Sequence, residues 1–589
     1  VFGDYSKESE VLRSSWVISD QRGGIGVKHM KEKRDHDRVW WSTAWLGTDG
    51  HLVAPVLATD ATNPTGADAR VLIEYANQLY CVFGTDLRRR IEGGNSWSAT
   101  LGTLVGAPTD AIVHKSKLYF ACGTDFNRYD GTTLTKGATL NAAQACRYFV
   151  EWDDKIYAID DDGQMDVSTD EGVNWTADAL SNLPSGYFTS LFKYHDGSSP
   201  PTVIIYLGTK AGLYAHDNAN TKWTETELPL PFHDYGCVGA DRWREWAFIP
   251  SGMAVYQYKT GSVAAEITPM GLDRAYGVPQ AYAGNIVKLL RGHNFLYALV
   301  DATDTLERTL FGGEGAGGLG DAVIYDNTGY SAVFRWDGYG WSVVYLSTSA
   351  DTPIRAGTVC TADDNYRLWF GIDNTVFYVP LPVTLENPVE VSASTFAASF
   401  ENISPWFDAD NEVETKLAAE VIGYYTSMSA NEYFKVYYGT DFDDDTWTLL
   451  TNSDFPDGQI DRNGEATFEL ASGAGVAFKA IRFKEEGYRG STNTLTPDRR
   501  WLRLSYVPLL ATKWGFKTRV DCSRNYRFKT AAALQSALKT AKSAQAMGEF
   551  TFKNGNGSET HRVSIADMPG VEVGGRKNEG VYDVTLVAP

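Results

Sequence analysis

The stretch KLYFACGTDFNRYDG (117–131) points to the fold, because it joins an apolar, aromatic-containing strand to a second strand through a glycine-containing turn. Aromatic residues favour strands and glycine favours tight turns, so this stretch predicts a β-hairpin. Copies of it recur as NQLYCVFGTDLRRR (77–90), KIYAIDDDGQMDVSTDEG (155–172), VIIYLGTKAGLYAHD (203–217), REWAFIPSGMAVYQY (244–258), NFLYALVDA (294–302) and RLWFGIDNTVFYVP (367–380). An earlier stretch, TAWLGTDGHLVAP (43–55), reads like the copy at 203–217.

The spacing of these hairpins predicts a closed ring of sheets. One aromatic residue marks each copy: Tyr80, Tyr119, Tyr157, Tyr206, Trp246, Tyr297 and Trp369. Most gaps between markers are about 40 to 50 residues, the length of one four-stranded β-propeller blade. The wide gap before Trp369 contains GGEGAGGLGD (312–321), interpreted as a surface loop inserted in one blade. We predict seven blades; counting Trp45 gives eight, or else the N-terminal strands complete the last blade and lock the ring.

A second repeat runs in phase with the first. A turn glycine or asparagine follows each of several hairpins, and a bulky residue stands three positions later. The pairs are Gly94 and Trp97, Gly131 and Leu134, Gly172 and Trp175, Asn220 and Trp223, and Gly338 and Trp341. The turn residue tolerates positive φ, and the large ring is expected to pack between neighbouring sheets.

One copy, residues 168–175, matches S-x-D-x-G-x-x-W in full and resembles the Asp-box hairpin of sialidase-like and other propellers. The resemblance implies that Asp170 ties the turn backbone together while Trp175 anchors the turn in its blade. This is a structural device, so it supports the fold and says little about activity.

Beyond residue 381 the hairpin repeat stops and strict alternation begins, which predicts a half-exposed antiparallel β-sandwich. Its alternating stretches are 432–450, 465–473, 476–486 and 499–510, with opening strands expected within 398–426. We expect a mainly all-β chain in four parts. These are an N-terminal arm with the first strands (1–39), the β-propeller (40–382), the β-sandwich (383–510) and a small α+β docking domain (511–589).

The last part predicts a strand at 513–522, a helix at 529–548 capped by Gly548, a hairpin, and a terminal strand at 580–589. This order, with an edge strand that ends in VTLVAP (584–589), resembles the small C-terminal domains of tailed-bacteriophage tail-tip and baseplate proteins. The resemblance implies a unit that docks onto a tail tube or a neighbouring subunit, and the large propeller suits a multidomain virion protein.

The composition limits the partners of the chain. A net charge of −21 over 589 residues disfavours nucleic acid and anionic membranes, since like charges repel. No run of eighteen apolar residues predicts a membrane span. Residues 1–15 carry charges where a signal peptide would need an apolar core. We expect free, mostly buried thiols, because the cysteines lack the spacing of a zinc site or a disulfide framework: Cys81, Cys122, Cys146, Cys237, Cys360 and Cys522.

The sequence predicts no catalytic, cofactor-binding or metal-binding residues and no cofactor. A sialidase would need an Arg-Ile-Pro signature, but Phe248 precedes Ile249 and Pro250. The arginines of LRRRIEGG (87–94) stand at adjacent strand positions and point to opposite faces, so they cannot converge on one anion. The acidic runs at 160–166 and 441–447 suggest calcium, but turn acids are the simpler interpretation. The histidines in HMKEKRDHDR (29–38) suit an exposed loop.

Two functions of different class remain. The first is a non-enzymatic structural protein of a virion tail, extracellular, with the propeller as rigid spacer or adhesion head and 511–589 as attachment module. Its expected partners are other tail proteins, copies of itself and a host-surface glycan. The alternative is a secreted glycan-binding or glycan-hydrolysing propeller of sialidase type.

Overall fold

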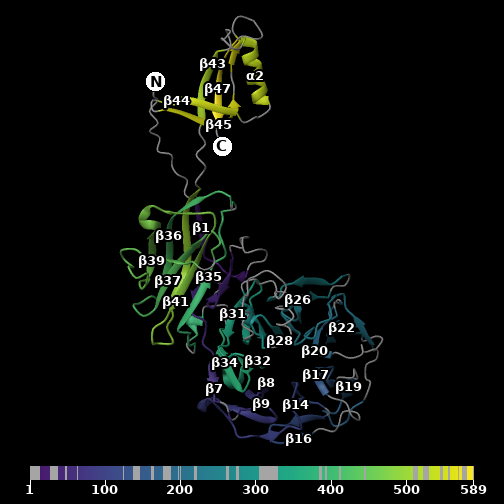
Figure 1. Ribbon diagram of the computed structural model, residues 1–589. Coiled ribbons are helices and arrows are strands. Elements are labelled where there is room, and N and C mark those ends of the chain that lie inside the picture. The colour runs from purple at the N-terminus through teal and green to yellow at the C-terminus, as the bar shows by residue number, and fades with distance from the viewer. Residues whose placement is uncertain are drawn as a thin grey trace, which may run out of the picture.

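Figure 1 shows the computed structural model of the chain as a ring of sheets, a pair of facing sheets beside it, and a C-terminal sheet with a helix beyond that pair. The structure describes residues 14–26, 37–46, 50–62, 64, 66–123, 125–136, 146–160, 165–176, 188–196, 198, 200–217, 222–260, 264–272, 278–303, 329–383, 388–391, 394–409, 411, 413–443, 446–508, 515–521, 530–543, 548–554, 557–567, 570–572 and 580–587.

In the described part of the chain the ring shows seven sheets whose successive strands pair antiparallel; they are numbered here as blades 1 to 7 in chain order. Blade 1 contains β8 (Ala69–Tyr75), β9 (Gln78–Phe83), β10 (Asp86–Ile91) and β11 (Ser96–Trp97), with β12 (Gly102–Thr103) also paired to β10. Blade 2 contains β13 (Asp110–His114), β14 (Lys117–Cys122), β15 (Asp125–Tyr129) and β16 (Leu134–Lys136). Blade 3 contains β17 (Cys146–Trp152), β18 (Lys155–Asp160) and β19 (Met165–Ser168).

The other four blades follow the same plan. Blade 4 contains β20 (Phe188–His195), β21 (Val203–Thr209), β22 (Gly212–Asp217) and β23 (Lys222–Glu225). Blade 5 contains β24 (Asp241–Trp243), β25 (Trp246–Ser251), β26 (Ala254–Lys259) and β27 (Glu266–Pro269). Blade 6 contains β28 (Asn285–Arg291), β29 (Leu296–Asp301), β30 (Ala332–Trp336) and β31 (Trp341–Leu346). Blade 7 contains β32 (Ile354–Cys360), β33 (Arg367–Ile372) and β34 (Thr375–Pro380).

The ring closes on itself and is completed by a strand from the N-terminal part of the chain. The first strands of neighbouring blades contact one another in order, and β32 of blade 7 contacts β8 of blade 1. The fourth strand of blade 7 is β7 (Thr59–Ala61), which pairs antiparallel with β34. Closure therefore joins residues near 60 to residues near 377 by main-chain hydrogen bonds.

Each predicted marker aromatic stands in the second strand of a blade, from Tyr80 in β9 to Trp369 in β33. The bulky residues of the second repeat stand at or beside fourth strands, and Trp97, Trp223 and Trp341 are buried. The glycine-rich stretch 312–321 lies outside the described residues, but β29 and β30 pair directly, so the insertion falls between these two strands of blade 6.

Beside the ring, two antiparallel sheets face each other. Sheet I has the order β39 (Gly464–Glu469), β36 (Lys416–Thr426), β42 (Asp498–Pro508), β6 (Leu52–Val53) and β5 (Trp45–Leu46), with β1 (Ser14–Ile18) on β42 and β40 (Val476–Phe478) on β36. Sheet II has the order β38 (Thr448–Leu449), β37 (Tyr433–Thr440), β41 (Ile481–Tyr488), β35 (Ser399–Ile403) and β4 (Trp41–Ser42). Aromatic rings meet between the sheets: Tyr425 lies 5.4 Å from Phe434 and Trp16 lies 5.9 Å from Phe483.

The N-terminal segment, residues 14–61, ties the ring to the facing sheets. Its strands β1, β4, β5 and β6 pair within sheets I and II, whereas β2 (Gly24–Ile25) pairs with β31 of blade 6 and with β3 (Arg38–Val39), and β7 belongs to blade 7. A side chain at Gly24, which has a φ of 75°, would collide with the backbone of Trp341. From blade 6, Arg335 donates to the Leu46 carbonyl at 2.6 Å and lies 3.2 Å from the centre of the Trp45 ring.

This pairing differs from the expected start of the propeller at residue 40, and it places the stretch 43–55, which is counted toward an eighth blade only as an alternative, outside the ring. The stretch does form a hairpin, β5–β6, but it extends sheet I. The local pattern specifies a turn between two strands; it does not specify the sheet that those strands join.

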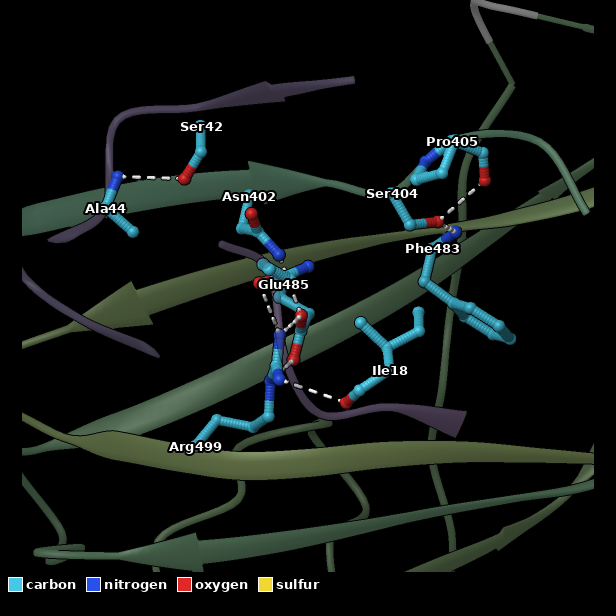
Figure 2. Close-up of polar contacts among 10 residues, drawn as sticks. Ile18, Ser42, Ala44, Asn402, Ser404, Pro405, Phe483, Glu485 and Arg499 are labelled. Atoms are coloured by element: carbon cyan, nitrogen blue, oxygen red, sulfur yellow. Dashed lines mark hydrogen bonds and ion pairs between the residues drawn. The ribbon is translucent and has the colours of Figure 1, made fainter. Parts of the chain in front are cut away.

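A buried ion pair lies between the facing sheets (Figure 2). Glu485 stands on β41 at an inward position, next to Phe483 on the same face. The guanidinium of Arg499 meets both of its carboxylate oxygens, at 3.0 and 2.9 Å. Arg499 also donates to the Ile18 carbonyl at 3.2 Å, and Asn402 donates to Glu485 at 3.0 Å. The pair therefore joins sheets I and II to the strand β1 from the other end of the chain.

The C-terminal unit is a sheet in the order β43 (Gly515–Asp521), β47 (Gly580–Val587), β45 (Gly557–Asp567) and β44 (Gly548–Asn554), with β46 (Gly570–Glu572) on β47 and helix α2 (Ala531–Ser543) against β45. The terminal strand was expected at an edge, but β47 lies between β43 and β45, so the described edges are β43 and β44. The helix is shorter than 529–548, and Gly548 begins β44.

The described cysteines are free and buried, as expected for Cys81, Cys122, Cys146, Cys237 and Cys360; Cys522 lies outside the described residues. Within the described part of the chain, helices with the length and apolar character to cross a membrane are absent.

Candidate functional site: the axial channel of the ring

The first strands of the blades surround an axial cavity of about 330 Å³. These strands are apolar for most of their length because both faces lie against neighbouring sheets. Five charged side chains interrupt them and line the cavity: Arg70, Asp110, Asp241, Lys288 and Arg355. The cavity has the size of a small-ligand site and the few convergent polar groups typical of one.

Two carboxyl groups lie deep in this channel. Asp110 accepts a hydrogen bond from the Phe149 amide at 2.9 Å, which links blade 2 to blade 3. Burial raises the pKa of Asp110, and the charge of Lys288 opposes that shift. Burial likewise raises the pKa of Asp241, while Arg291 and Lys288 act in the opposite direction. Lys288 is therefore the cation shared by both acids inside the channel.

At the rim of the channel, the carboxylate of Asp68 forms ion pairs with both arginines that line the cavity. Asp68 lies 3.1 Å from Arg70 and 3.5 Å from Arg355. Asp373, from the turn between β33 and β34, is close to Asp68, and burial together with this neighbouring carboxylate raises the pKa of Asp373. The protonated form of Asp373 is therefore favoured more than that of an isolated carboxyl group.

The arginines of the 87–94 run have separate partners. Arg88 pairs with Asp86 at 3.7 Å, Arg89 donates to Gln78 at 3.2 Å, and Arg90 is buried with its guanidinium 4.7 Å from the Trp369 ring. The three cations are therefore distributed over different neighbours, as the alternation along a strand implies.

In the 441–447 run, the described aspartates accept hydrogen bonds from backbone amides. Asp441 accepts from the Lys479 amide at 2.7 Å and Asp443 accepts from the Thr446 amide at 3.1 Å. Residues 161–164, 444 and 445 lie outside the described residues, as do residues 29–36. Among the described side chains, no group of three or more His, Cys, Asp or Glu is arranged to hold a metal ion.

The 168–175 turn is tied together by its own side chains. Asp170 accepts from the Asn174 amide at 2.8 Å, and Ser168 accepts from the Gly172 amide at 2.8 Å. The Asn174 bonds hold the pKa of Asp170 at about 2. Gly172 has a φ of 77°, and the Trp175 ring lies 5.4 Å from Phe126 of blade 2. The turn thus fastens blade 3 to blade 2.

The axial residues escaped prediction from the sequence. Arg70, Asp110, Asp241, Lys288 and Arg355 all stand in the strand before a marker hairpin. A charged residue within an otherwise apolar first strand was therefore a usable signal, once the hairpins had been assigned to blades.

Residues 111–243 match the family described as DUF6242 beta propeller domain, so a β-propeller domain is present. This range runs from blade 2 to the first strand of blade 5. A search of curated proteins found no matching relative.

Two solved structures illustrate the structural likeness. YCF48 from Cyanidioschyzon merolae is 9% identical over 55% of this chain and 98% of its own, with a TM-score of 0.38. The extracellular domain of the putative hybrid two component system BT4673 from B. thetaiotaomicron is 13% identical over 59% of this chain and 46% of its own, with a TM-score of 0.40. At such low identities and scores these likenesses carry no inference about function, and none of the matches links the chain to phage tail proteins.

Proposed function

We propose that this chain is a structural component of a bacteriophage tail or a similar virion assembly. In this proposal a seven-bladed propeller serves as a rigid spacer or adhesion head, a β-sandwich supports it, and the C-terminal α+β unit is the attachment module. The protein acts outside the cell, as part of the particle, without catalysis. Its partners are other tail proteins, copies of itself and a glycan on the host surface.

The observation that carries the proposal is the contrast between the two ends of the chain. The N-terminal segment pairs with blades 6 and 7 and with both facing sheets, which favours one rigid body from residue 14 to residue 508. The described strands β43 to β47, in contrast, pair only among themselves. A rigid head and a separately built sheet with two open edges suit projection and attachment, because an unpaired edge strand can add to the sheet of a neighbour.

The direct test is assembly with and without an intact C-terminal unit. Val584 is buried in β47, at 2% exposure, so Val584→Asp should disrupt this unit and leave the ring and the facing sheets folded. We expect the variant to lose incorporation into particles, or self-association measured by light scattering. The exposed substitution Val413→Asp in the facing-sheet region, where Val413 is 87% exposed, is the matched control. Normal incorporation of Val584→Asp would refute the attachment role.

The axial channel favours one second candidate, a glycan-hydrolysing propeller of sialidase type. Its support is the pair of carboxyl groups, Asp68 and Asp373, beside Arg70 and Arg355 at the rim. Hydrolysis of a fluorogenic sialoside that is abolished in Asp373→Asn would establish this enzyme. Absence of turnover across a panel of fluorogenic glycosides would leave the structural role.

A further inference from the structure

A second cavity, of about 530 Å³, lies between the first hairpin turns of blades 5 and 6. It is lined by Arg242, Trp243, Arg244, Arg291, Gly292 and His293. The arginines and the histidine are exposed, whereas Trp243 is buried. We call it the arginine pocket; it opens at the turns of the ring and is separate from the axial channel described above.

The scaffold of the arginine pocket holds one guanidinium in place. The Trp243 indole donates to the Gly292 carbonyl at 3.1 Å, which joins the turns of the two blades. The guanidinium carbon of Arg244 lies 4.2 Å from the centre of the Trp243 ring, and one of its nitrogens reaches the Asn294 carbonyl at 3.5 Å. Stacking on an indole limits the freedom of Arg244 before any ligand arrives, which lowers the entropic penalty of binding.

The positive charge of the pocket is poorly compensated. None of its three arginines forms an ion pair with a carboxylate in the part of the chain that the structure describes. The nearby Glu245 pairs with Lys259 at 3.1 Å instead. Asp241, on the channel side, is the carboxyl group whose pKa responds to Arg291 and Arg242. One acid thus faces two of the three guanidinium groups of the pocket, although the whole chain carries a net charge of −21.

Elsewhere in the described structure arginines are commonly paired, for example Arg367 with Glu92 at 2.7 Å and Arg499 with Glu485 at 2.9 Å. Three neighbouring guanidinium groups repel one another and weaken the fold unless an anion neutralises them. Guanidinium groups bind carboxylate, sulfate and phosphate through paired N–H donors, so this donor set suits an oxyanion.

We propose that the arginine pocket binds an acidic saccharide, through a carboxylate or sulfate group on the sugar. The cavity is larger than a bare anion requires, so we expect the ligand to have an uncharged part as well as an anionic group. The turn beside Arg244 carries an exposed aromatic residue: a Cβ placed on Gly338 would lie 3.7 Å from Arg244, and the next residue, Tyr339, is 66% exposed with the Arg22 guanidinium 5.4 Å from its ring centre. An exposed ring of this kind can stack on a sugar. Nucleic acid is the less suitable polyanion, because the net charge of −21 repels an extended phosphate chain.

This inference rests on the proposed role of the propeller as an adhesion head and gives that head a ligand class. Titration calorimetry on the full-length chain would use 3′-sialyllactose, a heparin-derived disaccharide, neutral lactose, sodium sulfate and a thymidine oligonucleotide. We expect one of the acidic sugars to bind and lactose not to bind. Arg242→Gln/Arg291→Gln should weaken that binding by about tenfold or more, because two charged donors are lost. Arg462→Gln, on an exposed arginine of the facing-sheet region, should bind as the wild type does.

A third variant separates the sugar from its charge. Tyr339→Ala should weaken binding of the acidic sugar but leave the binding of sulfate unchanged. Equal binding by the Gln double variant and the wild type, sulfate binding as strongly as the sugar, pocket-dependent oligonucleotide binding, or no binding by either acidic sugar would each overturn the proposal. Particle incorporation is a separate readout, so a negative sugar titration with normal incorporation would reject the ligand class and retain the structural role.

Discussion

The ring and the facing sheets both depend on an arginine–glutamate pair, but they place it in different surroundings. In the ring, Glu92 of blade 1 receives two hydrogen bonds from Arg367 of blade 7, and the carboxylate is 32% exposed. Between the facing sheets, the Arg499 and Glu485 side chains are only 1% and 2% exposed. The first pair fastens one of several similar blade boundaries, whereas the second joins two sheets and the strand β1 at a single point.

The ring and the facing sheets distribute their stabilising polar contacts differently. The ring repeats its fastening: Tyr75, Trp152, Tyr194 and Trp243, all in first strands, donate a hydrogen bond to a main-chain carbonyl of the next blade. Loss of one such bond leaves the others intact. The facing sheets concentrate their polar contacts in one buried network, where removal of one charge leaves its partner without solvent or counterion.

The largest effect is expected from Arg499→Met. The change leaves Glu485 buried and unpaired, so the free energy of unfolding should fall by about 3–5 kcal/mol. Hydrogen exchange should show the loss of protection mainly in β36, β41 and β42, with the blades less affected. The double variant Arg499→Met/Glu485→Leu should regain most of the loss. Equal loss of protection in the blades would contradict this division between the two regions.

A smaller effect is expected from Glu92→Gln at the boundary between blades 7 and 1. The hydrogen bonds from Arg367 lower the pKa of Glu92 below 4.5, so ionised Glu92 stabilises the fold above pH 4.5 and this contribution fades as the pH falls through the folded pKa. The variant should lose about 1.5–3 kcal/mol at neutral pH in urea unfolding, and the difference should vanish in acid. Glu245→Gln, which breaks an exposed pair with Lys259, should change stability by about 1 kcal/mol at most.

A still smaller effect tests the repeated fastening. Tyr194→Phe removes the hydroxyl that donates to the Glu245 carbonyl at 2.6 Å, so stability should fall by about 1 kcal/mol, measured by urea unfolding. Tyr256→Phe, on strand β26 of blade 5, serves as the control and should be close to neutral. A loss as large as that of Arg499→Met would show that the blade boundaries are not redundant.

The smallest effect is expected in the axial channel, where stability should change with pH in the opposite direction to that predicted for Glu92. Burial raises the pKa of Asp110 above 3.8, so the wild type loses stability as the pH rises from 3.8 through the raised folded value. Asp110→Asn keeps an acceptor for the Phe149 amide, so the variant should be as stable at neutral pH and should lack this slope. Asp130→Asn is the contrasting control, because turn hydrogen bonds from Thr133 and Thr132 hold the pKa of Asp130 at about 2 and its ionised form is the stabilising one. Unfolding in urea between pH 4 and pH 7 separates the two.

The hairpins of the ring could be predicted from the sequence because their information is local. An aromatic strand, a turn residue and a second strand are adjacent in the chain, and Tyr119 or Trp369 marks a strand that the structure has in the expected place. The turn residues Gly131, Gly172 and Gly338 have positive φ, as the hairpin pattern predicts. In the turn that contains Gly94, the residue with positive φ is Asn95.

The long-range pairing could not be predicted from local pattern. The β5–β6 hairpin at Trp45 looks like a blade hairpin, and only its pairing with β42 reveals that it belongs to sheet I. Glu485 breaks the apolar inward face of β41, and its partner Arg499 follows on another strand and in the other sheet. The arginine pocket likewise joins two turns that are separated by an entire blade hairpin.

The pairing of β1 with β42 has a consequence for biosynthesis. Trp16 leaves the ribosome long before the strand that pairs with it, which ends at Pro508, so β1 waits while the ring and most of the facing sheets are synthesised. At about 5–20 residues per second, this delay is roughly 25–100 s. During that time the apolar strand β1 can associate with other nascent chains. The ring, in turn, cannot close until β34 (Thr375–Pro380) has been synthesised, because β34 pairs with β7. The facing sheets therefore cannot complete their pairing until Asp498–Pro508 has been synthesised, and chains that terminate before this strand would carry an unpaired β1.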